Sequence, residues 1–384
     1  MIGERSLMDI RAFAERLPRS VFSFRGYNVD NLGRTPELLV HPVYGPILAD
    51  FLARASLVCS DVVRRHVDLI ARVREKRETS LEVYDEAIAL IVAVELGQLA
   101  VLRDVFGIDY VRAPLAMGYS LGELTTLVAS GVFNMEDVLR IPIALATDCI
   151  ALAADAHLGV LFSRGSALPL DKVQRLCLEI NQQGRGVVGV SSLLSPNSLL
   201  LMGQGDTLVR FREAMPVAIN SHAFLRLNKQ QWPPMHTAIT WERCIPNRAA
   251  QMMHRMAGGI TAPRPQVLSL VTGKLSYNEH NARHLLHQWV DHPQRLWEAV
   301  HHVLATDFET VVHVGPAPNI VPATFHRLAE NVTLQLKASL GMRALNFVRR
   351  PWLKTFLPQS TALLRAPTLQ HIVLEDWLLE QDVK

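Results

Sequence analysis

Apolar residues along the chain fall into short runs typical of buried strands and longer stretches with helical spacing. The stretch 81–106 is apolar almost all round, which predicts a central, buried helix. A second helical region is predicted at 46–76. Short apolar runs predict strands at 21–24, 110–117, 267–272 and 310–314. Because helices separate these strands, the pattern predicts an α/β domain with a mostly parallel sheet covered by helices.

Between 157 and 229 the pattern changes to shorter units. Strands and helices are predicted there in the order β-α-β-β-α-β, typical of a ferredoxin-like unit, at 159–163, 171–181, 187–194, 199–203, 207–215 and 223–227. The predicted organisation is a large α/β domain made of 20–156 and 230–330, with an inserted ferredoxin-like subdomain at 157–229. A C-terminal helical extension follows at 331–384, with an amphipathic helix at 369–379.

One short motif lies where a predicted strand passes into a predicted helix. The residues Gly-Tyr-Ser-Leu-Gly at 118–122 have the G-x-S-x-G spacing of a nucleophile elbow, a tight turn that exposes the serine hydroxyl at a helix start. Apolar residues at helical spacing continue to Val132, with Gly131 placed to end the helix. The same five-residue pattern also arises by chance as a glycine-rich turn, so the motif alone leaves that alternative open.

Composition narrows the function classes. The 384 residues carry 39 basic and 36 acidic side chains, a net charge of +3 that is too near balance to indicate a nucleic-acid partner. Four cysteines lie far apart, which predicts neither a disulfide framework nor a zinc site and favours the cytoplasm. The most apolar run, 87–102, contains Glu95 and Gln98 and is too short for a membrane span, so no membrane partner is expected.

Four segments together resemble a known family. They are 118–123, the Leu-Val-Ala-Ser-Gly-Val run at 127–132, Pro-Met-His at 234–236 and Val-His-Val-Gly-Pro at 312–316. Over residues 20–330, and in this order, they are similar to the malonyl-CoA:acyl carrier protein transacylases and the related polyketide synthase acyltransferase domains. The resemblance implies a hydrolase-like α/β domain with an inserted ferredoxin-like subdomain, which agrees with the pattern of predicted elements.

The resemblance also implies site residues. Ser120 matches the acyl-accepting nucleophile and His236 the base that activates it, since a serine hydroxyl is a weak nucleophile until an imidazole takes its proton. A helix-capping or surface histidine is the alternative for His236. The implied oxyanion hole consists of the backbone N–H groups of Leu121 and Arg25. The first loop departs from the family pattern, because Phe-Ser-Phe-Arg-Gly at 22–26 replaces the usual Phe-Pro-Gly-Gln-Gly.

Two positions bear on the substrate. Malonyl-transferring members of the family carry an arginine in the helix after the elbow, whose guanidinium holds the malonyl carboxylate. Counting from Ser120 places Leu145 there, while Arg140 matches a different position. Tyr119 replaces the histidine that normally precedes the nucleophile in the malonyl enzymes. A carboxylate beside Leu145 would be unpaired in a partly dry site, so the prediction is an acyl group without a carboxylate.

The resemblance therefore implies an acyltransferase that moves a non-carboxylated acyl group between thioesters through an acyl-serine, in polyketide or fatty-acid-type biosynthesis. The expected partners are acyl carrier protein and an acyl-CoA or acyl-phosphopantetheine thioester. Two alternatives stay open: an acyl carrier protein hydrolase that clears stalled chains, and an inactive scaffold that binds carrier protein. No cofactor or metal is expected, because the histidines at 280, 284 and 287 lack a matching cysteine or carboxylate.

Overall fold

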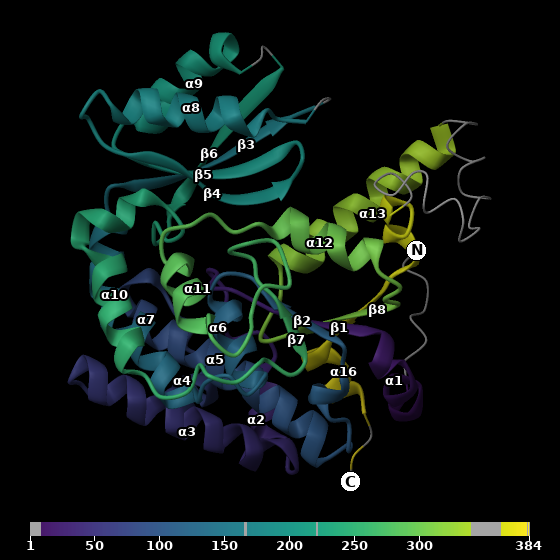
Figure 1. Ribbon diagram of the computed structural model, residues 1–384. Helices are drawn as coiled ribbons and strands as arrows, with labels where there is room; N and C mark the ends of the chain where they lie inside the picture. Colours follow the sequence, from purple (N-terminus) through teal and green to yellow (C-terminus); the bar gives the residue numbers. More distant parts are fainter. Residues whose placement is uncertain (1–8, 165–166, 220–221, 339–361, 382, 384) are drawn as a thin grey trace.

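The computed structural model describes residues 9–164, 167–219, 222–338, 362–381 and 383. A five-stranded sheet forms the centre of the larger part of the molecule, in the order β7-β2-β1-β8-β9, and every pairing between its described strands is parallel (Figure 1). Its strands are β1 (Ser20–Phe24), β2 (Leu115–Gly118), β7 (Gln266–Leu268), β8 (Thr310–Val314) and β9 (Gln370–Val373). The predicted α/β fold with a mostly parallel sheet is thus confirmed.

Both faces of this sheet are covered by helices. Successive side chains of a strand point to opposite faces, so the apolar strands of the sheet contribute to two cores. In β1, Phe22 and Phe24 belong to the core under α3 (Tyr44–Val63), α5 (Tyr84–Asp104) and α7 (Met135–Ala153). Val21 belongs to the opposite core, together with side chains of α12 (Leu296–Ala305) and α13 (Ile320–Ala338). The helix predicted at 81–106 is central as expected, since α5 is buried over nearly its whole length.

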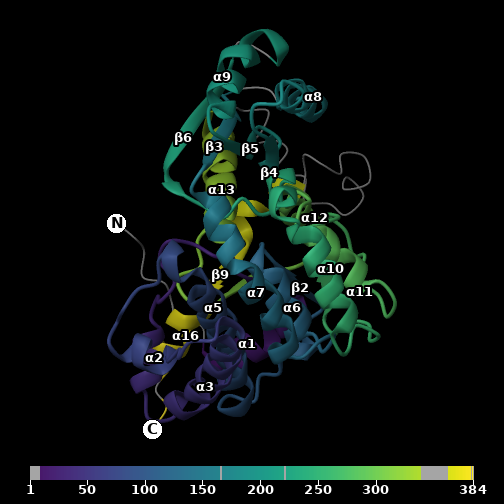
Figure 2. The ribbon, with the colours of Figure 1, turned by 90° about the vertical axis from the view of Figure 1, so that its left-hand side faces the viewer.

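The insertion folds as predicted, in the order β3 (Ala156–Ser163), α8 (Leu170–Asn181), β4 (Val188–Ser195), β5 (Ser198–Gln204), α9 (Thr207–Ala218) and β6 (Ala223–Gln231). Its antiparallel strands have the order β4-β5-β3-β6, that of a ferredoxin-like sheet. Figures 1 and 2 show α8 and α9 on the side of this sheet that is away from the large sheet. The opposite face of the small sheet is therefore turned toward the large domain.

Several predicted elements are shorter or divided. The strand expected at 110–117 begins only at Leu115, because 110–112 form a 3-10 helix before Pro114. The strand expected at 267–272 ends at Leu268. The long helix expected at 46–76 breaks at Arg64, which adopts a left-handed conformation at φ 57°. The two strands end or begin within an apolar run, which hydrophobicity alone does not reveal, whereas the helix ends at the polar residues 64–66, between two stretches with helical spacing.

The C-terminal segment differs most from its prediction. Residues 369–379 were expected to form one helix, but 370–373 form β9 and only Leu374–Glu380 is helical, as α16. β9 pairs in parallel with β8, and Trp377 of α16 packs edge-on against Phe13 of α1 (Ile10–Arg16). The end of the chain thus belongs to the core of the large domain. Residues 339–361 of the predicted extension lie outside the described residues.

The remaining elements connect these layers. The α-helices are α2 (Thr35–Val40), α4 (Leu69–Arg74), α6 (Leu121–Ala129), α10 (Ile245–Arg255) and α11 (Ala282–Trp289). The 3-10 helices are η1 (Leu17–Arg19), η2 (Leu81–Val83), η3 (Tyr110–Arg112), η4 (Ala238–Arg243) and η6 (Ala366–Thr368).

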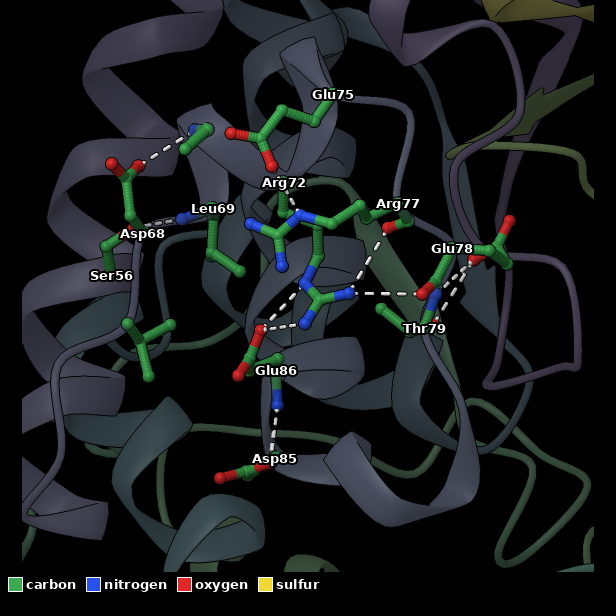
Figure 3. A network of polar contacts seen from close by, with 12 residues as sticks. Ser56, Asp68, Leu69, Arg72, Glu75, Arg77, Glu78, Thr79, Asp85 and Glu86 are labelled. Carbon is green, nitrogen blue, oxygen red and sulfur yellow. Dashed lines mark hydrogen bonds and ion pairs between the residues drawn. The ribbon is translucent and has the colours of Figure 1, made fainter.

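A polar network anchors the start of α5 (Figure 3). The Arg72 guanidinium of α4 donates to Glu86 Oε2 at 2.7 Å and also to the carbonyls of Arg77 and Glu78. The Glu78 carboxylate in turn accepts the backbone N–H of Asn31 at 2.9 Å. These bonds hold the N-terminal turn of α5 against the loop that follows β1, and both segments contribute to the cavity described below.

Candidate active site

Ser120 lies in a sharp turn between β2 and α6. Its backbone has φ 54° and ψ −116°, a conformation that L-residues rarely adopt. Such a strained conformation persists only where the surrounding structure enforces it. The flanking glycines are required by close packing. A Cβ on Gly118 would lie 2.1 Å from the Gly122 carbonyl carbon, and one on Gly122 would lie 2.5 Å from the Phe24 carbonyl oxygen. The G-x-S-x-G run therefore forms a strained elbow rather than an ordinary glycine turn.

His236 lies directly beside the serine hydroxyl. Ser120 Oγ and His236 Nε2 are 2.8 Å apart, and His236 Nδ1 is 2.7 Å from the carbonyl oxygen of Trp289. Since that carbonyl can only accept, Nδ1 carries the proton and Nε2 is free to accept the serine proton. The imidazole is 4% exposed, and this burial lowers the pKa of His236 to about 4. The ring is thus neutral at physiological pH, the state that a general base requires.

Two further side chains hold this corner together, and sequence reasoning identified neither. Gln294 is completely buried; its Oε1 accepts the Ser120 N–H at 3.0 Å, and its Nε2 lies 3.3 Å from His236 Nδ1. Trp289 Nε1–H donates to the Ser120 carbonyl at 2.8 Å. Gln294 is 174 residues from Ser120 and belongs to no recognisable motif, so nothing in the sequence indicated it.

The two predicted oxyanion donors differ in their surroundings. Leu121 is the first residue of α6, and an N–H at that position has no partner within its own helix. The Arg25 N–H, in contrast, donates to the buried Glu95 Oε1 at 2.8 Å. The loop lies close to the nucleophile, because a Cβ on Gly26 would be 3.2 Å from Ser120 Cβ. In this structure the N–H of Arg25 therefore already has an acceptor other than a substrate.

The Arg25 side chain also has hydrogen-bond partners within the protein. Its guanidinium is buried and donates to the Gly26 carbonyl at 2.8 Å and to Asn31 Oδ1 at 2.7 Å, as well as to the carbonyl of Pro316. Burial raises the pKa of Glu95 to about 8, although the Arg25 charge and N–H act in the opposite direction. Arg25 and Glu95 together form a buried polar support for the first loop.

A cavity of about 390 Å³ opens at Ser120. Part of its wall comes from the small sheet, including Leu158, Leu200 and Met202, and another part comes from α13. Tyr119 lies in the lining beside the nucleophile, as its predicted substrate-binding role requires. The complete lining is Gly26, Tyr27, Asn28, Tyr84, Tyr119, Ser120, Leu158, Ser191, Leu194, Leu200, Met202, Trp232, Pro233, Met235, His236, Asn319, Ile320, Ala323, Thr324 and Arg327.

Aromatic side chains from three separate segments meet in this lining. The ring of Tyr27 lies edge-on to that of Tyr84 at 4.7 Å between centroids, and to that of Trp232 at 5.9 Å. Arg327, an exposed residue of α13, is the only formally charged side chain among the lining residues. Away from the serine and histidine, the described wall is therefore mainly apolar and aromatic.

Leu145 is absent from this lining. It is 2% exposed and belongs to the main core, within α7. One turn further along α7, Cys149 Sγ lies 3.6 Å from Met235 Sδ, and Met235 does line the cavity. α7 thus lies behind the wall rather than in it. Arg140 is also away from the cavity, paired with Asp61 at 2.6 Å on the surface.

Within the described residues, no group of three or more histidine, cysteine or acidic side chains is arranged to hold a metal ion. The helix carrying His284 and His287 instead places His284 3.1 Å from Gln288 Nε2. A search of the same residues for a helix long and apolar enough to cross a membrane found none.

The sequence and the structure of this chain were compared with those of known proteins. No family model matches the sequence, and no curated protein matches it. Solved structures do match. The chain is similar to FabD from Acinetobacter baumannii, with 16% identity over 80% of this chain and 90% of that chain and a TM-score of 0.65.

Two further solved structures are similar to this chain. An acyl carrier protein S-malonyltransferase from Vibrio cholerae is 15% identical over 92% of this chain and 96% of its own, with a TM-score of 0.62. A malonyl-transacylase solved in complex with its type II polyketide synthase acyl-carrier protein is 20% identical over 80% and 92%, also at 0.62. The chain therefore has the fold of the malonyl-CoA:acyl carrier protein transacylases, and the resemblance predicted from its motifs is confirmed at the level of the fold.

Proposed function

We propose that this protein is an acyltransferase that moves a non-carboxylated acyl group between thioesters through an acyl-Ser120 intermediate. The observation that carries the proposal is the 2.8 Å contact between Ser120 Oγ and the buried, neutral His236 Nε2 at the cavity. A hydrogen-bonded nucleophile and base, with the base oriented by a third group, is the arrangement that covalent acyl transfer needs. Here the third group is the Trp289 carbonyl.

The proposed reaction has two half-reactions. His236 Nε2 takes the hydroxyl proton while Ser120 Oγ attacks the thioester carbonyl, and the tetrahedral intermediate collapses with cleavage of the C–S bond. The leaving thiolate receives the same proton from Nε2. An acceptor thiol then gives its proton to Nε2 and attacks the acyl-serine carbonyl. The bond between Ser120 Oγ and the acyl carbon breaks, Nε2 returns the proton to Oγ, and the acceptor leaves as the new thioester.

The oxyanion of each tetrahedral intermediate needs donors that are already in place. We assign one to the Leu121 N–H, by its position at the start of α6. Arg25 remains the second proposed donor, on the condition that its N–H leaves Glu95 when substrate binds. The proximity of Gly26 to Ser120 supports a contribution from this loop.

The lining supports the choice of a neutral acyl group. Tyr84, Trp232 and Met202 are uncharged, and the one charged side chain of the described lining, Arg327, is on the exposed surface of α13. A carboxylate bound among these three side chains would meet no cation there, and leaving a charge unpaired in a dry site is costly. This argument replaces the one based on Leu145, which lies outside the lining. Acyl carrier protein is the proposed partner, supported by the similar transacylase that was solved with its carrier.

The test is an acylation assay in which the mass of the intact protein is measured by mass spectrometry. Acetyl, hexanoyl and malonyl thioesters of coenzyme A are incubated with the native protein, with Ser120→Ala and with Ser191→Ala, which removes another serine of the same cavity. We expect one acyl mass on the native protein and on Ser191→Ala, none on Ser120→Ala, and slower labelling by malonyl than by the neutral donors. Strong malonyl preference contradicts the proposed substrate, and absence of all labelling supports the inactive scaffold.

A second step separates transfer from hydrolysis. Protein preloaded on Ser120 is followed with and without a phosphopantetheinylated carrier protein. Slow decay alone and fast decay with carrier are expected for the transferase. Rapid release of free acid without any acceptor supports the hydrolase instead.

A further inference from the structure

Gln294 occupies a position between the nucleophile and the base that no motif indicated. It is fully buried, and its backbone is bonded on both sides to β4 of the small sheet: its N–H donates to the Ser191 carbonyl at 2.9 Å and its carbonyl accepts the Leu193 N–H at 2.8 Å. The residue therefore connects the small sheet to the reacting groups of the large domain.

The orientation of the Gln294 amide follows from its neighbours. The Ser120 backbone N–H can only donate, so the atom 3.0 Å from it must be the amide oxygen. That choice places the amide NH₂ 3.3 Å from His236 Nδ1, which itself carries a proton directed at the Trp289 carbonyl. The flipped amide would set two donors against each other at Ser120 and is excluded.

This geometry has an electrostatic consequence for His236. The amide NH₂ lies 3.3 Å from Nδ1, a nitrogen whose proton is already donated to the Trp289 carbonyl, so the positive end of the amide dipole lies next to the imidazole and opposes its protonation. Burial acts in the same direction, while the Trp289 carbonyl and the carboxylate of Asp291 favour the protonated ring. Asp291 is itself engaged by Trp241 Nε1–H at 2.8 Å and by His292 at 2.7 Å.

We propose that Gln294 is a positioning residue for the Ser120–His236 pair, holding the strained nucleophile backbone through its carbonyl and keeping His236 neutral through its amide NH₂. The role in acylation rests on the proposed function. The contact with His236, however, has a consequence that is measurable without any substrate. A glutamine that opposes protonation differs from the carboxylate of a serine–histidine–acid triad, which stabilises the imidazolium.

The decisive variant is Gln294→Glu, which keeps the side-chain length. Its carboxylate can still accept the Ser120 N–H, and it places a negative charge beside His236 Nδ1 where the positive end of the amide dipole was. The sign of the interaction with the ring is therefore reversed. We expect the acid midpoint of Ser120 acylation to rise by about one pH unit or more above that of the native protein. Gln294→Met removes both polar contacts and is expected to slow acylation about tenfold, with a smaller shift of the midpoint.

Gln288→Glu is the matched control. It introduces the same change of charge on the same segment of chain, but Gln288 contacts His284 and not His236. Its midpoint is expected to match that of the native protein. Thermal unfolding of each variant verifies folding, and the near-isosteric Gln294→Glu decides the question even where Gln294→Met does not fold.

A second readout does not depend on activity. The ring proton of His236 is titrated by NMR, with its signal assigned from the spectrum of His236→Asn among the 15 histidines. The same upward shift in Gln294→Glu is expected whether or not any thioester labels the protein. An unchanged or lowered His236 midpoint in Gln294→Glu overturns the inference, whereas a shifted midpoint with no labelling of the native protein overturns only the acyltransferase function.

Discussion

The two ends of the cavity are built in different ways. At the proposed reacting end, Ser120 and His236 both have positive φ angles, at 54° and 65°, and both are bonded to Trp289: its indole N–H donates to the Ser120 carbonyl, and its carbonyl accepts from the His236 ring. At the other end, where we propose that the acyl group binds, the wall includes side chains from α5, the small sheet, α13 and the loop that carries Trp232. A strained backbone turn requires particular residues at fixed positions and can therefore be recognised as a motif. A wall of packed side chains can be formed by many different sequences.

The difference also limits what can be predicted by counting residues from the motif. Six residues around Ser120 form one rigid turn, so a motif match determines their arrangement. Leu145 is 25 positions further on, in a helix whose position depends on packing, and in this structure Met235 stands between that helix and the cavity. Substitutions at the two ends should therefore have different kinds of effect.

The largest effect is expected at the reacting end, for His236→Ala. Loss of the base should lower the rate constant of Ser120 acylation by about 10²- to 10⁴-fold, while folding is retained. The measurement is single-turnover acylation with a neutral thioester. His292→Ala removes a half-exposed histidine that is not among the lining residues and should acylate at close to the native rate. Equal rates in both variants would remove His236 from the reaction.

The next effect concerns stability. Leu145→Arg places a charge in the apolar core and should lower the free energy of unfolding by about 3 kcal/mol or more, without creating malonyl acylation. Urea unfolding measures the first outcome and acylation by malonyl-CoA the second. Leu57→Arg, on the exposed face of α3, is the control and should change stability by no more than about 0.5 kcal/mol. A stable, malonyl-preferring Leu145→Arg would place Leu145 in the acyl wall after all.

The smallest effect is expected from one aromatic side chain of the acyl end. Trp232→Ala removes apolar contact area that a longer acyl chain can use and acetyl cannot. The ratio of hexanoyl to acetyl acylation rates should therefore fall about tenfold. Acetyl serves as the internal control, because its rate should stay near that of the native protein. A ratio that does not change would show that the chain binds elsewhere in the cavity.

Much of the architecture was predictable because it is encoded locally. Hydrophobic spacing predicted the central helix at 81–106 and the β-α-β-β-α-β order of the insertion, and both were confirmed. The exceptions lie where a segment's partner is distant. Residues 370–373 form β9 because they pair in parallel with β8, at the edge of the sheet. No local pattern in the sequence distinguished them from the helix that follows.

The sequence by itself determined the elbow, since close backbone packing admits only glycine at positions 118 and 122, and its motifs indicated the two residues that we propose as nucleophile and base. Tertiary structure alone decided what surrounds them. Gln294 reaches Ser120 across 174 residues, and Glu95 reaches the Arg25 N–H across 70. These contacts depend on where separate elements pack, and a polar side chain carries no mark of the distant group whose hydrogen bond it will satisfy.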